Sequence, residues 1–221
     1  MSNYRIMIVE DERLGAMDLE DRLKQFGYDV VGNLSSGEDA IALCGQVWPD
    51  MLVMDIQLQG KLDGIEAAGQ IKALYDIPAI FLTAFADQKT ILRAKLVEPA
   101  GYILKPFDEL QLQTTLEIAL YRLEIEKKLK ASEARFRSVF WQSPVGIALI
   151  DKDWRLLDAN SACLKIFHAE NLENLIGMSL LADPNFGIAV ADIRLPRETV
   201  EFEFDYDFGK VSTLGQQASG V

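Results

Sequence analysis

The chain has 221 residues, of which 49% are hydrophobic and 25% are charged, a composition typical of one large or two small soluble domains. Its 22 basic and 34 acidic side chains give a net charge of −12, which argues against nucleic acid and anionic membranes as partners because phosphate binding needs clustered cations. The sequence contains no apolar run of about 18 residues and begins without a secretory signal. We therefore expect a cytoplasmic protein.

Charge also divides the chain into three parts. Residues 1–106 and 139–221 are both acidic overall, whereas residues 107–138 carry equal numbers of basic and acidic side chains. Two acidic blocks that flank a neutral, densely charged segment predict two domains and a helical connector. We place the first domain at residues 1–122, its last helix with the connector at 107–138, and the second domain at 139–221.

The two cysteines, Cys44 and Cys163, lie far apart in apolar stretches. Two such thiols form neither a disulfide framework nor a metal site. We expect both to be buried, reduced thiols.

Short apolar runs alternate with amphipathic runs over the first hundred residues. The apolar runs predict strands at residues 5–9, 28–31, 51–54, 79–82 and 101–104. The helical spacing of apolar residues predicts helices at residues 14–26, 40–47, 65–74 and 89–97. A strand followed by a helix, repeated along the chain, predicts an α/β fold with a doubly wound, five-stranded parallel sheet.

Polar residues follow the predicted strands at their carboxyl ends, where ligands bind in such sheets. Residues 10–12 (Glu-Asp-Glu) follow the first strand, Asp55 the third, Thr83 the fourth and Lys105 the fifth. Acids after a strand often only cap the next helix, and one Thr or Lys at a strand end carries little information. Because all these groups lie at the same edge of the sheet, we favour a functional site over that alternative.

The chemistry of this set is that of phosphoryl transfer. Mg²⁺ is usually held by one or two carboxylates together with waters and phosphate oxygens. An aspartate can attack phosphorus and form an acyl phosphate. The cation and a lysine then neutralise charge on the phosphoryl oxygens, and a threonine hydroxyl can hydrogen-bond to them.

Residues 1–122 resemble the receiver domain of two-component response regulators. The resemblance is carried by RIMIVEDE at 5–12, MLVMD at 51–55, AIFLTA at 79–84 and GYILKPF at 101–107. It implies the flavodoxin-like fold and phosphorylation of Asp55 by a histidine kinase or a phosphotransfer protein. It also implies that Mg²⁺ is the cofactor.

The resemblance further assigns roles to single residues. It implies that Glu10, Asp11, Asp55 and the backbone carbonyl of Gln57 hold Mg²⁺. The other implied roles are Thr83 as switch hydroxyl, Lys105 as phosphate-binding lysine and Tyr102 as the aromatic residue whose orientation follows Thr83. The Lys105–Pro106 peptide bond is expected to be cis, as X–Pro bonds can be.

The sequence departs from the family pattern at two places. The segment DIQLQGKLDG at 55–64 lacks the usual proline and reaches its Asp-Gly turn one residue late, which leaves the path of this loop and the position of Gln57 open. Phe85 lies two residues after Thr83, and its bulk predicts slow dephosphorylation because it restricts the attacking water.

Residues 110–139 contain neither Pro nor Gly and are rich in Leu, Glu and Lys, which predicts one long helix that continues from the receiver. Its apolar residues follow a heptad with two polar members: Ile118, Ile125, Ser132 and Val139, with Arg122, Leu129 and Phe136 between them. We favour a parallel homodimer of this helix over a solvated amphipathic helix that packs on its own domain.

The remaining residues predict a small mixed α+β domain. Strands are expected at residues 145–150 and 154–157, and helices at residues 159–167 and 172–176. Apolar and acidic residues alternate strictly at 200–208, which predicts a strand with one solvated acidic face.

This second part resembles a PAS domain, a family used for ligand sensing, dimerisation or signal relay. The resemblance rests on SEARFRSVFWQSPVGIALIDKDWRLLDANSACLKIF at 132–167 and NLIGMSL at 174–180. Because residues 212–221 are poor in apolar side chains, we expect an incomplete PAS domain. His168 is expected to be a surface or capping residue rather than a haem ligand, and the sequence assigns no cofactor to this part.

The sequence as a whole predicts a response regulator that relays phosphorylation of Asp55 through a helix to a PAS-like domain. It predicts a signalling protein rather than an enzyme, with self-phosphorylation and slow autodephosphorylation as its only reactions. Two alternatives remain open. The chain can be the N-terminal part of a hybrid sensor kinase or another larger signalling enzyme, or an interaction scaffold that is not phosphorylated.

Overall fold

A computed structural model describes residues 4–84, 88–169, 171–173 and 175–182. The chain forms two compact units, Met1–Lys128 and Leu129–Val221, each with most of its residue contacts within itself. In the described ranges, no helix is long and apolar enough to cross a membrane.

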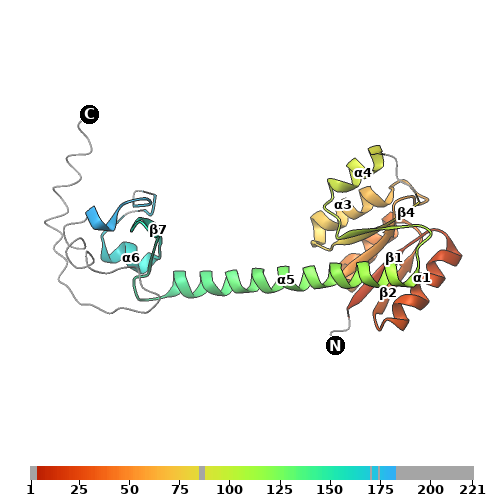
Figure 1. The fold of residues 1–221 in the computed structure, drawn as a ribbon, viewed down its shortest axis with the longest axis horizontal. Helices are drawn as coiled ribbons and strands as arrows, with labels where there is room; N and C mark the ends of the chain where they lie inside the picture. The colour runs from red at the N-terminus through yellow and green to blue at the C-terminus, as the bar shows by residue number, and fades with distance from the viewer. Residues whose placement is uncertain (1–3, 85–87, 170, 174, 183–221) are drawn as a thin grey trace. The chain divides into compact units, whose positions relative to one another are not determined.

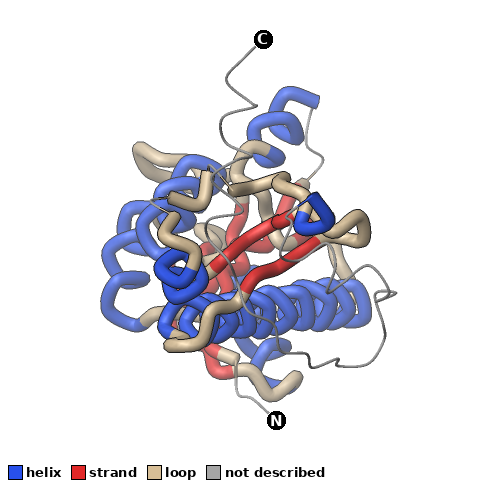
Figure 2. The backbone as a smooth tube through the Cα atoms, turned by 90° about the vertical axis from the view of Figure 1, so that its left-hand side faces the viewer, coloured by secondary structure: helices blue, strands red, loops and turns tan. Residues whose placement is uncertain are grey.

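The first unit is a five-stranded parallel sheet covered by helices (Figures 1 and 2). The sheet has the strand order β2-β1-β3-β4-β5, which confirms the predicted doubly wound fold. Its strands are β1 (Arg5–Val9), β2 (Asp29–Leu34), β3 (Met51–Asp55), β4 (Ala79–Thr83) and β5 (Gly101–Leu104). The helices are α1 (Arg13–Gln25), α2 (Gly37–Val47), α3 (Gly64–Tyr75), α4 (Gln88–Lys95) and α5 (Glu109–Gln142).

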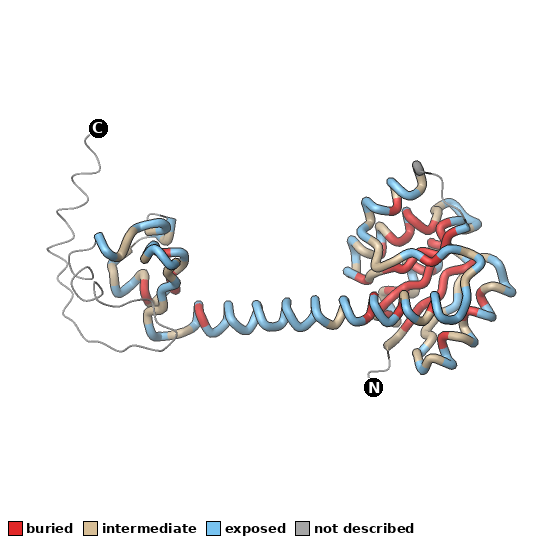
Figure 3. The backbone as a smooth tube through the Cα atoms, viewed as in Figure 1, coloured by how far each residue is buried: buried red, intermediate tan, exposed pale blue. Residues whose placement is uncertain are grey.

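The sheet separates two hydrophobic layers because successive strand residues point to opposite faces. Ile6 and Ile8 of β1 pack with α1 and α5 on one face. Met7 and Val9 pack with α2 and α3 on the other face. The three central strands are buried on both faces, as their unbroken apolar runs predict, and Figure 3 shows the buried residues concentrated there.

Two boundaries in the first unit differ from the prediction by three residues. β2 continues to Leu34 because residues 32–34 pair with β1, although Gly32 and Asn33 are poor strand formers. α2 begins at Gly37 rather than Ala40, since Ser36 caps it by accepting a hydrogen bond from the backbone N–H of Asp39 (3.2 Å).

Both cysteines are buried, as predicted. Burial raises the pKa of Cys44 to about 11 and also raises the pKa of Cys163, so neither thiol is ionised at neutral pH. We expect both to resist a disulfide reagent in the folded protein at pH 7 and to react quickly in guanidinium chloride. A spectrophotometric thiol titration tests this, and rapid reaction of either thiol without denaturant would contradict it.

Helix α5 is continuous over the predicted connector and extends to Gln142. Its N-terminal part belongs to the receiver core through Leu112, Leu116, Ala119 and Leu120. Beyond these residues most of the helix is exposed (pale blue in Figure 3).

The second unit contains an antiparallel pair of strands, β6 (Ala148–Ile150) and β7 (Leu156–Ala159), followed by α6 (Ser161–Ile166) and a short 3₁₀ helix, η1 (Leu180–Ala182). β6 is shorter than predicted because the backbone groups just before this strand form hydrogen bonds with the Asn160 side chain instead of with another strand. The Asn160 amide donates to the Val145 carbonyl and its oxygen accepts from the Ile147 N–H, both at 2.9 Å.

Three further expectations in this unit have different outcomes. The helix predicted at residues 172–176 is wrong: the described residues form a turn, in which the Leu172 carbonyl accepts from the N–H groups of Leu175 and Ile176 before Gly177 adopts a positive φ of 78°. His168 is exposed just after α6, as predicted. The strand predicted at residues 200–208 lies outside the described residues, as do residues 212–221.

Candidate functional site

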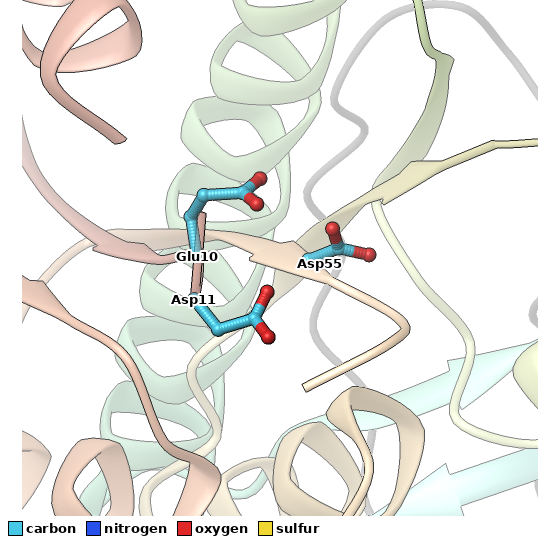
Figure 4. A group of neighbouring side chains, drawn as sticks. All are labelled: Glu10, Asp11 and Asp55. Carbon is cyan, nitrogen blue, oxygen red and sulfur yellow. The ribbon is translucent and has the colours of Figure 1, made fainter. Parts of the chain in front are cut away.

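Three carboxylates meet at the carboxyl edge of the sheet (Figure 4). Glu10 and Asp11 follow β1, and Asp55 is the last residue of β3. β1 and β3 are neighbouring parallel strands, with Val9 paired to Met54, so their ends lie side by side. One oxygen of each carboxylate lies within 4.8 Å of the others, as the strand-end pattern predicts.

Lys105 compensates part of this negative charge. Its ammonium donates hydrogen bonds to Glu10 Oε2 and to Asp55 Oδ2, both at 2.5 Å. The Glu10 and Asp55 side chains are only 2% and 11% exposed, a degree of burial at which an unpaired charge is costly. The four charged groups therefore form one cluster, in which Lys105 offsets part of the negative charge of the three acids.

Burial and hydrogen bonding change the pKa values of two groups in this cluster, Glu10 and Lys105. Burial raises the pKa of Glu10, although its hydrogen bond from Lys105 opposes the shift. Burial also disfavours the charged form of Lys105, but the hydrogen bonds to Asp55 and Glu10 outweigh that effect and raise the pKa of Lys105. Lys105 is therefore a permanent cation at neutral pH.

The residues at this edge fit a magnesium ion. Carboxylate oxygens are the ligands that Mg²⁺ prefers in proteins, and the ion usually keeps several waters. An open cleft of about 400 Å³ borders the three acids and also includes Gln57 and Lys105. The Gln57 N–H donates to Asp55 Oδ1 at 2.9 Å, which holds the start of the β3–α3 loop beside the acids.

Thr83 and Tyr102 are not among the described residues that line the cleft beside the acidic cluster. Thr83 ends β4 and is buried, and its carbonyl accepts the Lys105 N–H at 2.7 Å. Tyr102 on β5 is half-exposed, with its ring centroid 6.1 Å from that of Phe81. The Lys105–Pro106 peptide bond is cis, as predicted. Phe85 lies outside the described residues.

Two long-range interactions that hold the β3–α3 loop, a hydrogen bond and an ion pair, were not predicted from the sequence. Glu38 on α2 accepts the Lys61 N–H at 2.9 Å, and hydrogen bonds from its own backbone and from Lys61 lower the pKa of Glu38. Arg93 on α4 donates to Asp63 at 2.6 Å. Asp63 is also the N-cap of α3, in a capping box with Glu66. The local capping box is readable from sequence, whereas the long-range partners have no local signal.

Gly64 lets the start of α3 lie directly against the carboxyl end of β3. Its N–H donates to the Ile56 carbonyl at 3.0 Å, and a Cβ at this position would lie 1.9 Å from the Asp55 carbonyl oxygen. Only glycine fits here without a shift of Asp55 or of α3.

The substitution Gly64→Ala is therefore expected to destabilise the receiver unit by about 1–3 kcal/mol, the usual cost of overpacking. Gly69→Ala is the matched control, because its Cβ would meet only Val97 at an ordinary 3.7 Å and alanine is the better helix former. Urea unfolding of both variants measures the difference. Equal stability of the two variants would show that the contact at Gly64 relaxes without cost.

Comparisons with known proteins agree with this geometry. The family model for the response regulator receiver domain matches residues 6–117, and a PAS domain model matches residues 134–200. The chain is 36% identical over 118 residues to the transcriptional regulatory protein PdtaR of Mycobacterium tuberculosis, which is 53% of this chain and 57% of that protein. It is 30% identical over 182 residues to the uncharacterized transcriptional regulatory protein YrkP of Bacillus subtilis, covering 76% of this chain and 77% of that protein.

Two solved receiver structures are also similar. One is the signal receiver domain of a modulated diguanylate cyclase from Desulfovibrio desulfuricans G20 (39% identity, TM-score 0.54, 56% of this chain and 98% of that chain). The other is the N-terminal domain of a response regulator/sensory box/GGDEF three-domain protein from Carboxydothermus hydrogenoformans (33% identity, TM-score 0.51, 55% and 98%).

These matches define the class of protein. The chain belongs to the response regulator receiver family, and a PAS domain follows its receiver. Receiver-domain relatives are response regulators of two-component systems. The chain spans little more than half of the length of PdtaR.

Proposed function

We propose that this chain accepts a phosphoryl group on Asp55 from a histidine kinase or a phosphotransfer protein and relays the change to its PAS domain. The observation that carries the proposal is the Asp55 carboxylate itself. It is nearly buried at a strand end and borders an open cleft. It accepts a hydrogen bond from the ammonium of Lys105, which can also donate to an oxygen of a phosphoryl group.

The proposed reaction is a displacement at phosphorus. An oxygen of Asp55 attacks the phosphorus of a phosphohistidine, the P–N bond breaks as the P–O bond forms, and the leaving imidazole takes up a proton. Lys105 then donates to an oxygen of the transferred group instead of to Asp55. The product is an acyl phosphate, and a later attack by water releases inorganic phosphate.

Receiver domains generally bind Mg²⁺ at an acidic pocket, and Glu10, Asp11, Asp55 and the backbone carbonyl of Gln57 are the residues that would hold it here. When bound, the ion supplies positive charge that neutralises the phosphoryl oxygens. Glu10 and Asp11 contribute by keeping two carboxylates beside the acceptor.

The relay is proposed to run through β4, β5 and α5. Thr83 hydrogen-bonds to the phosphoryl group through its hydroxyl and is the switch residue. Tyr102, which is paired with Phe81 on the adjacent strand, changes its orientation in response. α5 begins shortly after Lys105 and continues into the second unit, so a shift at β5 is passed along one helix to the PAS domain.

A second candidate is a receiver–PAS module within a larger signalling enzyme. It is favoured by the two similar receiver structures, which come from a diguanylate cyclase and a GGDEF protein. In both cases the receiver itself does the same chemistry. A silent interaction scaffold is disfavoured because the three acids and Lys105 lie together at the strand ends and a threonine, Thr83, ends β4.

The proposal is tested by incubating the full chain with acetyl phosphate, with Mg²⁺ or with EDTA, and measuring phosphorylation on a phosphate-affinity gel. We expect a slower-migrating band only with Mg²⁺. Absence of that band, under conditions that phosphorylate another receiver in parallel, would overturn the proposal and favour the scaffold.

A further inference from the structure

We propose that α5 is the pairing surface for a second copy of this chain, which it meets in a parallel, two-stranded coiled coil. The pairing goes beyond the proposed phosphoryl transfer and does not depend on it, because the residues that form it are in place in this structure without any phosphoryl group.

Helix α5 carries two apolar stripes, of which one packs against the sheet of the same chain in the part of the structure that is described. Leu116, Ala119 and Leu120 are buried against the sheet, and half-buried Leu123 continues that stripe. Lys127, one turn further along the same stripe, donates to Asp50 at 2.8 Å. This side of the helix is therefore occupied by the receiver of the same chain.

The second stripe is exposed. Its apolar members are between 47% and 70% exposed: Ile118, Ile125, Leu129, Phe136 and Val139. They lie seven, four, seven and three residues apart, spacings that place them on one side of the helix. A row of large apolar side chains that spans three heptads is more than the scattered exposure usual on a protein surface.

In coiled-coil notation, Arg122, Leu129 and Phe136 are the a positions, and Ile118, Ile125, Ser132 and Val139 are the d positions. The assignment places the receiver-bound residues 116, 120, 123 and 127 at b and f, on the outside of a pair, whereas Ala119, at the start of the stripe, is at e. A second helix can therefore cover the exposed stripe without displacing the receiver core from the first.

The flanking charges select a parallel orientation. The e positions are acidic (Glu126 and Glu133) and the g positions are basic (Lys128 and Arg135). In a parallel pair each g residue faces the e residue of the partner's next heptad, so Lys128 meets the partner's Glu133. An antiparallel pair sets e against e and g against g, and like charges would then face one another along both edges.

The proposal commits to two strands. A leucine at a beside an isoleucine at d, as in Leu129 and Ile125, favours three or four strands. Arg122 at an a position favours two strands, because in a pair its long side chain can extend past the seam and keep its charge in water. Lys128, which is bonded to Glu124 of its own helix at 2.7 Å, is exposed and can also reach across the pair.

Light scattering of the full chain at micromolar concentration tests the pairing. We expect the mass of a dimer, and a dissociation constant raised roughly tenfold or more by Leu129→Glu, which puts a charge into the seam. Ala131→Glu is the matched control, since Ala131 is exposed at a c position two residues away and should leave the dimer intact. Leu129 is itself exposed, so circular dichroism should show both variants folded.

Cross-linking tests the orientation. Ser132→Cys places a thiol at a d position in the seam, and we expect it to form an intermolecular disulfide under mild oxidation, whereas Ala131→Cys does not. A monomeric or trimeric wild-type mass, or a dimer that Leu129→Glu leaves unchanged, would overturn the proposal. Equal cross-linking of the two cysteine variants would overturn the parallel register.

Discussion

The Asp55→Asn variant is expected to take up no phosphoryl group from acetyl phosphate in the presence of Mg²⁺. An asparagine has nearly the same shape and can still accept a hydrogen bond from Lys105, but its amide is not a nucleophile toward phosphorus. The variant removes one of three neighbouring carboxylates while Lys105 keeps its bond to Glu10. We therefore expect a thermal midpoint no lower than that of the wild type.

Asp18→Asn is the control for this variant. Asp18 is an exposed acid on α1, paired with Arg22 at 2.8 Å, and its loss should leave the extent of phosphorylation unchanged. A phosphate-affinity gel measures both variants in one experiment. Undiminished phosphorylation of Asp55→Asn would place the acceptor at another residue.

The second large effect is expected at Asn160, which joins the end of α5 to the segment before β6 and to α6 within the second unit. Asn160 is fully buried and makes four hydrogen bonds to backbone groups. Its oxygen accepts from Ile147 and Cys163, and its amide donates to the carbonyls of Phe140 and Val145, all at 2.8–2.9 Å. Leucine fills a similar volume but leaves these four groups without their partner.

An unsatisfied buried backbone group costs about 1–3 kcal/mol, and local rearrangement will recover some of the four. We therefore expect Asn160→Leu to destabilise the second unit by roughly 3–5 kcal/mol. Hydrogen exchange should rise in residues 140–167 and stay unchanged in the sheet of the first unit, and phosphorylation should persist.

Ser161→Ala is the matched control, since Ser161 makes one exposed hydrogen bond, to the Trp141 carbonyl at 3.1 Å. Its effect should stay near 1 kcal/mol or below. Equal hydrogen exchange in Asn160→Leu and Ser161→Ala would show that the Asn160 side chain does not hold the end of α5 against the segment before β6.

The receiver fold could be predicted because its signals are local. A wholly apolar run such as residues 51–54 has few options other than a strand buried on both faces, and residues 110–139 lack any helix breaker. The second unit is harder because its backbone groups are satisfied by a side chain: Asn160 takes the bonds that would have extended β6. Residues 172–176 have helical spacing, but the positive φ of Gly177 redirects the backbone before a second helical turn can form.

The candidate site shows the same division. Glu10, Asp11, Asp55 and Lys105 could be predicted to meet, because the ends of parallel strands fall on one edge of the sheet. The ties of the β3–α3 loop could not be predicted. Glu38 and Lys61 are distant in sequence, and the close approach of Gly64 to the Asp55 carbonyl appears only when β3 and α3 are packed.

The most direct test of the account is to find the residue that carries the phosphoryl group. The chain is treated with acetyl phosphate and Mg²⁺, reduced with borohydride to convert the acyl phosphate to a stable alcohol, digested and mapped by mass spectrometry. The account predicts that Asp55 is converted to homoserine and that no other acid is. Conversion at Glu10 or Asp11 instead, or at no residue despite phosphorylation of a parallel receiver, would contradict it.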